Sequence, residues 1–228
     1  MKHKPVDPKR RWHKPNTGDA PPTRTYMVVD VEVFDTDWAS IGILVASYPQ
    51  GNILDTLEIG CADGTQINPD KQNFWNEHGA AFAYNRDLGT GTDRMEQEEH
   101  LCAFLEKWFQ KEPGLYLVSD NPMFDIGFLQ DLFVRHRKTQ SVMVRDGRYY
   151  PSICTWSMRR ATQLMTGTTF NHIQSCTRDV SVWSCDPRRL QHTPLADCGT
   201  TIAEFFLLLD FIFHFRYSWR KNHARYRY

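Results

Sequence analysis

The chain has 228 residues, of which 41% are hydrophobic, 13% aromatic and 24% charged. This composition excludes wholesale disorder and predicts one or two globular domains whose core needs no disulfide or metal to hold it. The formal net charge of zero hides a segregation, because residues 1–24 carry +5, residues 214–228 carry +5 and the body between them carries −10. An acidic body with two basic ends has to be explained by any assignment of function.

Both ends are expected to lie outside the globular core. Residues 1–24 are rich in proline and basic residues and have almost nothing apolar to bury, which predicts a flexible basic arm. Residues 214–228 form a C-terminal extension that interleaves arginine with tyrosine and tryptophan, a mixture suited to phosphate and base contacts. Docking of a protein partner, or of a second copy of the chain, is the alternative for both ends.

The cysteines and the apolar runs bear on where the chain works. Six cysteines form no C-x-x-C pair and follow no signal peptide, so free thiols in a reducing, cytoplasmic compartment are expected. The most apolar run, residues 202–215, is interrupted by charged residues and is too short to cross a bilayer. We therefore expect a buried helix there and no membrane contact.

Residues 25–213 read as one α/β domain. Three β-rich runs predict an antiparallel meander over residues 26–33, 39–47 and 53–59. Apolar periodicity then predicts, in order, a helix over 93–111, a strand over 115–118, a helix over 124–134, a strand near 142–144, a helix over 155–164 and a last helix from 194 to about 215. Strands followed by alternating helices and strands indicate helices flanking a mixed sheet that is antiparallel at first and then parallel.

Two acids lie on the first predicted strand. Asp30 and Glu32 are two residues apart among valines, so both carboxylates project from the same face of the strand. Two such acids repel each other unless a cation lies between them, and a hard divalent ion such as Mg²⁺ or Mn²⁺ prefers oxygen ligands. The alternative is an edge strand whose acids simply face water.

Two further segments place acids at the ends of elements. Asp125 opens a helix directly after a strand, where ligands commonly bind in α/β sheets, although an acid there also suits the helix dipole. Thr193 as N-cap and Pro194 at the first helical position put Asp197 one turn into the last helix. His192 lies on the loop just before that helix, where an imidazole can reach a water beside the acid, or can be merely structural.

The chain carries three motifs in order: D-x-E on the first strand, N-x-x-F-D-x-x-F-L in the middle and H-x-x-x-x-D before the last helix. Together they resemble the motifs of the DEDDh branch of the DnaQ-like 3′–5′ exonucleases, which have an RNase H-like fold. The resemblance covers about residues 25–213. Thr193 stands where the sister DEDDy branch has tyrosine, which favours the histidine branch. The segment from Phe74 to Glu77 also resembles the tryptophan-bearing helix of the phage and bacterial exoribonuclease-type subgroup.

The resemblance implies a mechanism and a set of site residues. The ligands of two divalent ions, Mg²⁺ or Mn²⁺, would be Asp30, Glu32, Asp125 and Asp197. His192 would take the proton from the attacking water, and cleavage at the 3′ end of single-stranded RNA or DNA would release nucleoside 5′-monophosphates. The expected substrate contacts are Val33, Phe34, Trp38, Trp75, Asn121 and Phe124. For Phe34 and Trp38, stacking on terminal bases competes with a place in the core.

The sequence departs from the family pattern in two places. Many relatives follow the glutamate with Thr and Gly, whereas Val33 and Phe34 stand here, so a different grip on the terminal nucleotide is expected. Ser119-Asp120-Asn121 replaces the more frequent His-Asn turn, which makes Asp120 a rival to Asp125 as metal ligand. The phenylalanine before Asp125 and the F-L after it favour Asp125.

Three other functions fit parts of the pattern. A catalytically silent nucleic-acid-binding domain of the same fold is disfavoured, because a binder has no need for four acids that repel phosphate. An endonuclease or transposase of the RNase H-like group is disfavoured by the late histidine–aspartate pair. A proofreading or trimming subunit that acts with a polymerase remains compatible, and a compact nuclease with such flanks suits a viral or phage source.

Overall fold

The computed structural model describes residues 23–35, 37–61, 67–137, 142–145, 148–149, 151–167 and 192–223. At its centre is a five-stranded sheet with the order β3-β2-β1-β4-β7. The strands are β1 (Arg24–Val33), β2 (Trp38–Tyr48), β3 (Ile53–Gly60), β4 (Tyr116–Ser119) and β7 (Ser152–Cys154). The first three are antiparallel, and β4 and β7 continue the sheet in parallel. This is the mixed sheet that the sequence predicts.

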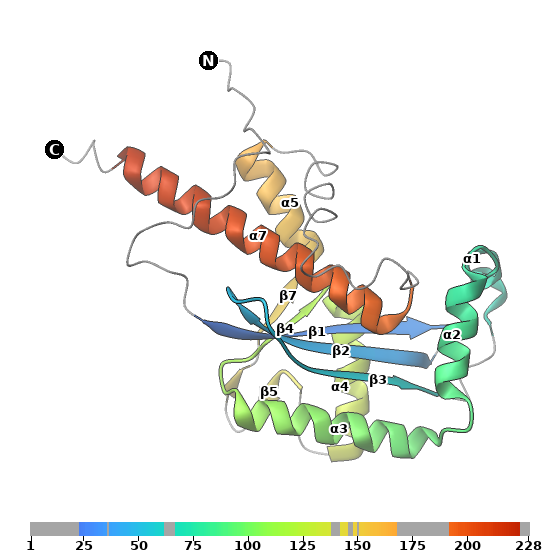
Figure 1. Ribbon diagram of the computed structural model, residues 1–228. Helices are drawn as coiled ribbons and strands as arrows, with labels where there is room; N and C mark the ends of the chain where they lie inside the picture. Colours follow the sequence, from blue (N-terminus) through green and yellow to red (C-terminus); the bar gives the residue numbers. More distant parts are fainter. Residues whose placement is uncertain are drawn as a thin grey trace.

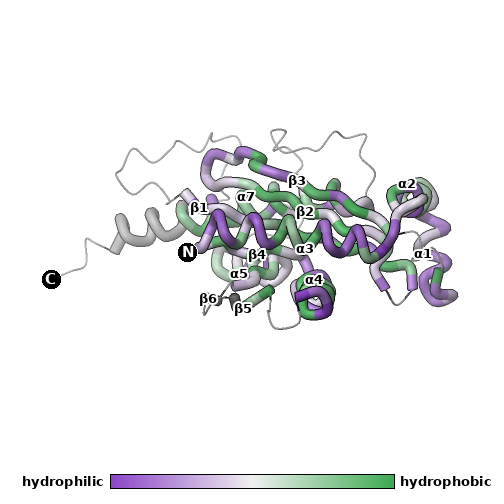
Figure 2. Tube along the Cα trace, turned by 90° about the horizontal axis from the view of Figure 1, so that it is seen from below, coloured by the Kyte–Doolittle hydropathy of each residue, from purple (hydrophilic) through white to green (hydrophobic). Residues whose placement is uncertain are grey.

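Helices cover both faces of the sheet (Figure 1). One face carries α5 (Thr155–Thr166) and α7 (Pro194–His223), and the other carries α3 (Arg94–Lys111) and α4 (Pro122–Arg137). The alternation along β1 supplies both cores, because Met27 and Val29 belong to the cluster with α3 and α4, whereas Tyr26 and Val28 belong to the cluster with α7. Figure 2 shows hydrophobic residues concentrated in the strands, while α3 alternates between hydrophilic and hydrophobic segments.

A third group of elements lies at the end of the sheet where β1 finishes (Figure 1). It consists of the 3₁₀ turn η2 (Pro69–Lys71), α1 (Gln72–Glu77) and α2 (Gly79–Gly89). These helices enclose a small core of their own, formed by Phe34, Ala39, Trp75 and Ala81. Among the described residues, no helix is both long and apolar enough to cross a membrane.

Some element boundaries differ from the sequence prediction. The last helix continues to His223 rather than ending near residue 215, because no glycine or proline follows Gly199 to stop it. The expected boundary between 213 and 214 therefore falls inside α7. At the other end, Arg24 already belongs to β1, and residues 1–22 of the expected arm lie outside the described residues.

The middle of the chain differs as well. The strand expected near 142–144 is β5 (Val144–Arg145), which pairs with β6 (Arg148–Tyr149) in a separate two-stranded sheet. The edge strand β7 was not predicted, because three residues are too few to show an alternating pattern. The helix expected over 155–164 is confirmed as α5.

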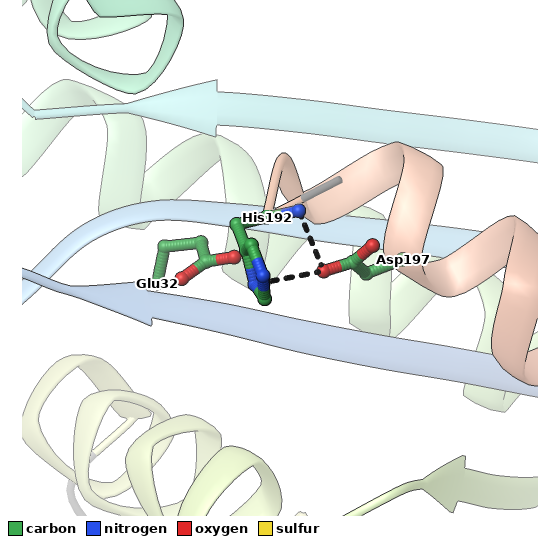
Figure 3. Close-up of side chains that lie close together, drawn as sticks. All are labelled: Glu32, His192 and Asp197. Atoms are coloured by element: carbon green, nitrogen blue, oxygen red, sulfur yellow. Dashed lines mark hydrogen bonds and ion pairs between the residues drawn. The ribbon is translucent and has the colours of Figure 1, made fainter. Parts of the chain in front are cut away.

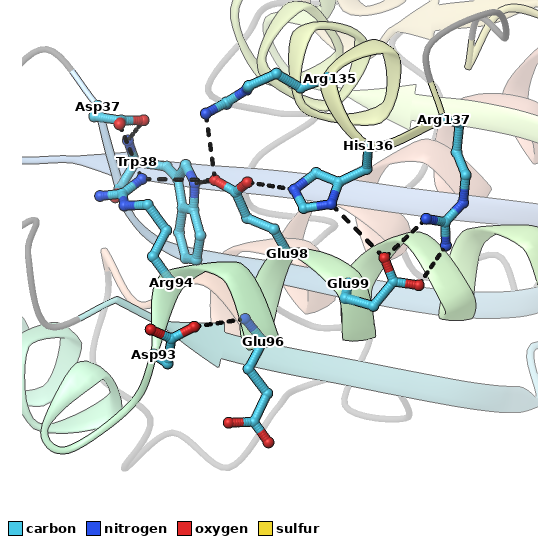
Figure 4. A network of polar contacts seen from close by, with 10 residues as sticks. All are labelled: Asp37, Trp38, Asp93, Arg94, Glu96, Glu98, Glu99, Arg135, His136 and Arg137. Atoms are coloured by element: carbon cyan, nitrogen blue, oxygen red, sulfur yellow. Dashed lines mark hydrogen bonds and ion pairs between the residues drawn. The ribbon is translucent and has the colours of Figure 1, made fainter.

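A buried carboxylate ties the sheet to α3 and α4 (Figure 4). Glu98 on α3 is fully buried and accepts hydrogen bonds from Trp38 Nε1 at 3.2 Å and His136 Nε2 at 2.6 Å. The guanidinium groups of Arg94 and Arg135 lie 3.8 and 3.6 Å from the same carboxylate. The carboxylate of Glu98 thus contacts polar groups from the start of β2, from α3 and from the end of α4.

Removing this carboxylate should destabilise the fold. We expect Glu98→Ala to lower the free energy of unfolding by about 3 kcal/mol, because it leaves buried polar partners without their acceptor. The control is Glu96→Ala, on the exposed face of the same helix, which should change that free energy by less than about 0.5 kcal/mol. Urea unfolding followed by circular dichroism measures both, and equal effects would contradict the assigned role of Glu98.

Candidate metal and catalytic site

The first two acids of the site come from β1. Asp30 and Glu32 continue the line of Tyr26 and Val28, so they lie on the face that α7 covers. The Oδ2 atom of Asp30 is buried and accepts no hydrogen bond in the described structure. A buried carboxylate oxygen without a partner is costly unless a cation neutralises it.

A close approach of backbone to backbone brings the third acid over this face. Gly42 on β2 stands opposite Asp30, and a side chain there would place its Cβ 2.4 Å from the carbonyl carbon of Pro194. Only glycine therefore lets the first turn of α7 rest on the sheet. That turn begins as the sequence predicts, with Asp197 N donating to Thr193 O at 3.0 Å, and it places Asp197 beside the β1 acids.

Asp125 reaches the site from the first turn of α4, on the other side of the sheet. Its Oδ1 accepts a hydrogen bond from Val31 N at 3.2 Å, and its Oδ2 accepts one from Ser119 Oγ. Beyond Val28, β1 no longer pairs with β4, so the carboxylate of Asp125 takes a place between the two strand ends. Its orientation is therefore fixed by the backbone of β1 and by the last residue of β4.

His192 stands directly before α7 and points into the site (Figure 3). Its backbone N donates to Asp197 Oδ2 at 3.1 Å, and its Nδ1 lies 3.8 Å from the same oxygen. One ligand atom each of Glu32, His192 and Asp197 lie within 4.8 Å of one another. Side chains from β1 and from the start of α7 thus meet at the end of β1.

Burial and mutual repulsion make these acids hard to ionise. Burial is the main cause that raises the pKa of Asp30 well above its usual range, with Glu32 and Asp197 adding repulsion. Burial and the charges of Asp197 and Asp125 raise the pKa of Glu32 to about 8, although Lys71 opposes the shift. Burial also raises the pKa values of Asp125 and Asp197 to about 6.

The arrangement fits a divalent cation. A hard ion takes oxygen ligands, and the site offers four carboxylates, one of them with an unpartnered buried oxygen. The residues that can hold such ions are Asp30, Glu32, Asp125 and Asp197. Burial and the neighbouring His78 lower the pKa of His192, so its imidazole is neutral at pH 7 and has a free lone pair for a proton.

Asp120, the rival ligand, is engaged elsewhere. Its Oδ1 accepts a hydrogen bond from Thr155 Oγ1, and its backbone oxygen is contacted by Cys154 Sγ at 3.4 Å. It lies close enough to the cluster for its charge to raise the pKa values of Asp125 and Asp197. Asp125, with its carboxylate held against β1, is therefore the better-placed ligand.

The structure buries the side chains of four of the expected substrate contacts. Trp38 is fully buried with its indole on Glu98, and Phe34 and Trp75 pack against each other with ring centroids 4.7 Å apart. Val33 is buried too. Phe34 and Trp75 belong to the small core under α1 and α2, whereas Val33 and Trp38 belong to the core with α3 and α4, which the sequence does not reveal. Asn121 and Phe124 are exposed beside Asp125.

Several residues of the site were not predicted from sequence. Ser119 holds Asp125, and its place at the end of a strand just before the polar turn was the available signal. Phe74 of α1 and His78, directly after that helix, contact the ring of His192, with centroids 5.0 and 4.4 Å away. Asn85 of α2 bonds to the backbone of His192. The sequence marks Phe74 only as part of the segment that resembles a tryptophan-bearing helix, and nothing marks His78 and Asn85, because their contacts join segments more than 100 residues apart.

Comparison with known proteins rests on structure. No family model matches the sequence, and no curated protein matches it. Exonuclease I superimposes with a TM-score of 0.56 at 16% identity, over 85% of this chain and 43% of that protein. A zinc-bound complex of E. coli exonuclease I with single-stranded DNA gives 0.54 at 17% identity, over 84% and 43%. A full-length 3′-exonuclease gives 0.50 at 11% identity, over 81% of each chain.

These likenesses show the fold. The five-stranded mixed sheet with helices on both faces is the RNase H-like α/β fold of 3′-exonucleases, so the fold class expected from the sequence is confirmed. The chain spans less than half the length of exonuclease I.

The raised pKa values predict how metal and pH act on stability. Between the ordinary pKa of a carboxyl group, near 4, and the raised values, the folded protein binds more protons than the unfolded chain. The melting temperature in EDTA should therefore fall as pH rises from about 5 to about 8. Mn²⁺ should raise it more at pH 8 than at pH 5.5, because protons compete with the ion.

Melting curves across this pH range, with EDTA or Mn²⁺, measure both effects. Asp197→Asn is the matched variant, and it should flatten the pH dependence in EDTA and shrink the response to Mn²⁺. An equal response to Mn²⁺ at both pH values, unchanged in the variant, would show that the ion binds elsewhere.

Proposed function

We propose that the chain is a metal-dependent 3′–5′ exonuclease of the DEDDh type. It hydrolyses the phosphodiester bonds of RNA or DNA from the 3′ end and releases nucleoside 5′-monophosphates. The observation that carries the proposal is the convergence of four carboxylates and one histidine, from three distant segments, at one end of β1 in the fold of 3′-exonucleases.

The carboxylates provide the metal site in this proposal. The ligands of two divalent ions, Mg²⁺ or Mn²⁺, are Asp30, Glu32, Asp125 and Asp197, and the unpartnered Oδ2 of Asp30 supports this assignment. When bound, such ions would lower the pKa of a water, so that it loses a proton as it attacks phosphorus, and would stabilise charge on the leaving oxygen. The hydrogen bonds of Val31 N and Ser119 to Asp125 keep that ligand oriented before any ion arrives.

His192 is the general base in this proposal. Its lowered pKa leaves the imidazole neutral at physiological pH, so it can accept a proton from the attacking water. Asp197 Oδ2, 3.8 Å from Nδ1, stabilises the imidazolium that results. The side chain of His192 is about one third exposed, which gives it an open path to the solvent and the substrate.

The substrate is a single strand with a free 3′ end. Exonuclease I, a structural neighbour, is known in a complex with single-stranded DNA. In this chain, Phe124 and Asn121 are exposed beside Asp125 and can contact the terminal nucleotide by stacking and hydrogen bonding. The basic sequences of residues 1–24 and 214–228 would draw a polyanion toward an acidic body.

The first test is the loss of one ligand. Asp125→Asn keeps the size of the side chain and removes its charge, so we expect turnover to fall below detection while the melting temperature in EDTA stays the same or rises. Cleavage of 5′-labelled single-stranded RNA and DNA, with Mg²⁺, Mn²⁺ or EDTA, measures this. Full activity in EDTA, or in the variant, would falsify the two-metal assignment.

The second test concerns His192. General-base catalysis contributes roughly 10² to 10⁴ in rate, so His192→Ala should lose about that much in kcat while it still binds Mn²⁺ and the oligonucleotide. Turnover at saturating metal and isothermal titration with Mn²⁺ separate the two effects. A variant that loses metal affinity but keeps its rate per bound metal would make His192 a ligand rather than the base.

A further inference from the structure

The backbone of His192 adopts a conformation that few residues take. Its φ angle is 62°, in the left-handed region, where side chains other than glycine are uncommon. Such a conformation persists only when surrounding contacts determine it, and these residues cluster at functional sites. Contacts beyond those with the acids also hold the backbone of His192.

One of these contacts comes from a buried amide on α2. Asn85 Nδ2 donates a hydrogen bond to the backbone oxygen of His192 at 2.8 Å, and Asn85 Oδ1 accepts one from Ser40 Oγ at 2.9 Å. Asn85 and Ser40 are both fully buried. The carbonyl oxygen of His192 can only accept a hydrogen bond, so the amide nitrogen of Asn85 must face it, and the hydroxyl of Ser40 then donates to the amide oxygen.

This chain of bonds returns to the acids. Ser40 stands opposite Glu32 in the pairing of β1 with β2, and the backbone N of His192 donates to Asp197. The backbone oxygen of His192 is thus held by Asn85, which is bonded in turn to Ser40 beside Glu32. The backbone N of His192 is held by Asp197. The position of the base is fixed relative to two proposed metal ligands.

The helix that carries Asn85 has little room to move. A side chain at Gly89, the last residue of α2, would bring its Cβ within 2.5 Å of the carbonyl carbon of Cys61 at the end of β3. The backbone N of Cys61 in turn donates to Ala39 O at 2.8 Å, next to Ser40. The helix is therefore seated against the end of β3 and, through Cys61, against β2, the strand that carries Ser40.

The ring of His192 is confined as well. Phe74 of α1 and His78, directly after that helix, stand edge-on to it, at 5.0 and 4.4 Å between centroids, and they stack on each other at 4.4 Å. These rings limit rotation of the imidazole away from Asp197. The backbone and the side chain of His192 are thus restrained by separate groups, with Asn85 holding the backbone.

We propose that Asn85 is a positioning residue for the general base, a role that rests on the proposed nuclease function. Through the backbone of His192 it sets the place of the imidazole beside the metal ligands, without touching the substrate itself. Asparagine suits the position because it donates to a carbonyl and accepts from a hydroxyl at the same time. Leucine has a similar volume and can do neither.

The test combines one structural readout with one kinetic readout. In Asn85→Leu, hydrogen exchange at the backbone amide of His192, followed by NMR, should become at least about 10-fold faster, because the loop loses its restraint and the bond to Asp197 opens. The kcat should fall about 10- to 100-fold with KM nearly unchanged, as expected for a misplaced catalytic group. In the His192→Ala background, Asn85→Leu should cause no further loss in kcat.

Two further variants keep the test decisive. Ser40→Ala leaves Asn85 in place but removes the bond that orients its amide, so it should shift both readouts in the same direction by a smaller factor, even if Asn85→Leu does not fold. Thr90→Val removes an exposed hydrogen bond to Arg86 O at the end of the same helix and should shift neither.

Unchanged exchange at His192 in the folded variants would overturn the positioning role. A loss of kcat that persists undiminished in the His192→Ala background would also overturn it, because Asn85 would then act through another group. An inactive wild-type chain that still shows the difference in exchange would instead overturn the proposed function, and would leave the structural coupling of Asn85 to His192 in place.

Discussion

Four carboxylates repel one another in a shielded site at the end of β1, and the surrounding fold holds them in place against this repulsion. Burial raises the pKa values of Asp30 and Glu32, and the charges of the neighbouring acids raise them further. The fold holds the acids together by giving Asp125 and Asp197 donors from the backbone of Val31 and His192. Such dipoles orient a carboxylate without cancelling the charge that a metal ion needs.

The supports for the site come from all three groups of helices. α4 brings Asp125 from one face of the sheet, α7 brings Asp197 from the other, and α1 and α2 hold His192 at the end. Each group of helices packs in a hydrophobic cluster of its own, so its position does not depend on contacts among the acids. The buried network around Glu98 likewise anchors α3 and α4 to the sheet at some remove from the site.

The sequence predicts those parts of the fold and the site whose cause is local. Alternation along β1 predicts the common face of Asp30 and Glu32, and the cap at Thr193 with Pro194 predicts where Asp197 sits on its helix. It does not predict that Trp38 and Phe34 are core, because aromatic residues serve cores and stacking surfaces equally well. Nor does it reveal Asn85, whose partners lie 45 and 107 residues away along the chain.

The contact at Gly42 also governs how α7 lies on the sheet. Next to this glycine the helix buries small residues, Ala196 and Cys198, whereas farther along it buries Phe205 and Phe206, which pack on Tyr26 and Tyr48. Side chains that grow in size from one end to the other act as a wedge, and Figure 1 shows α7 rising away from the sheet toward its C-terminal end. The tilt of α7 relative to the sheet therefore follows from the increase in side-chain volume along the helix, and α7 lies nearest to the sheet at the turn that carries Asp197.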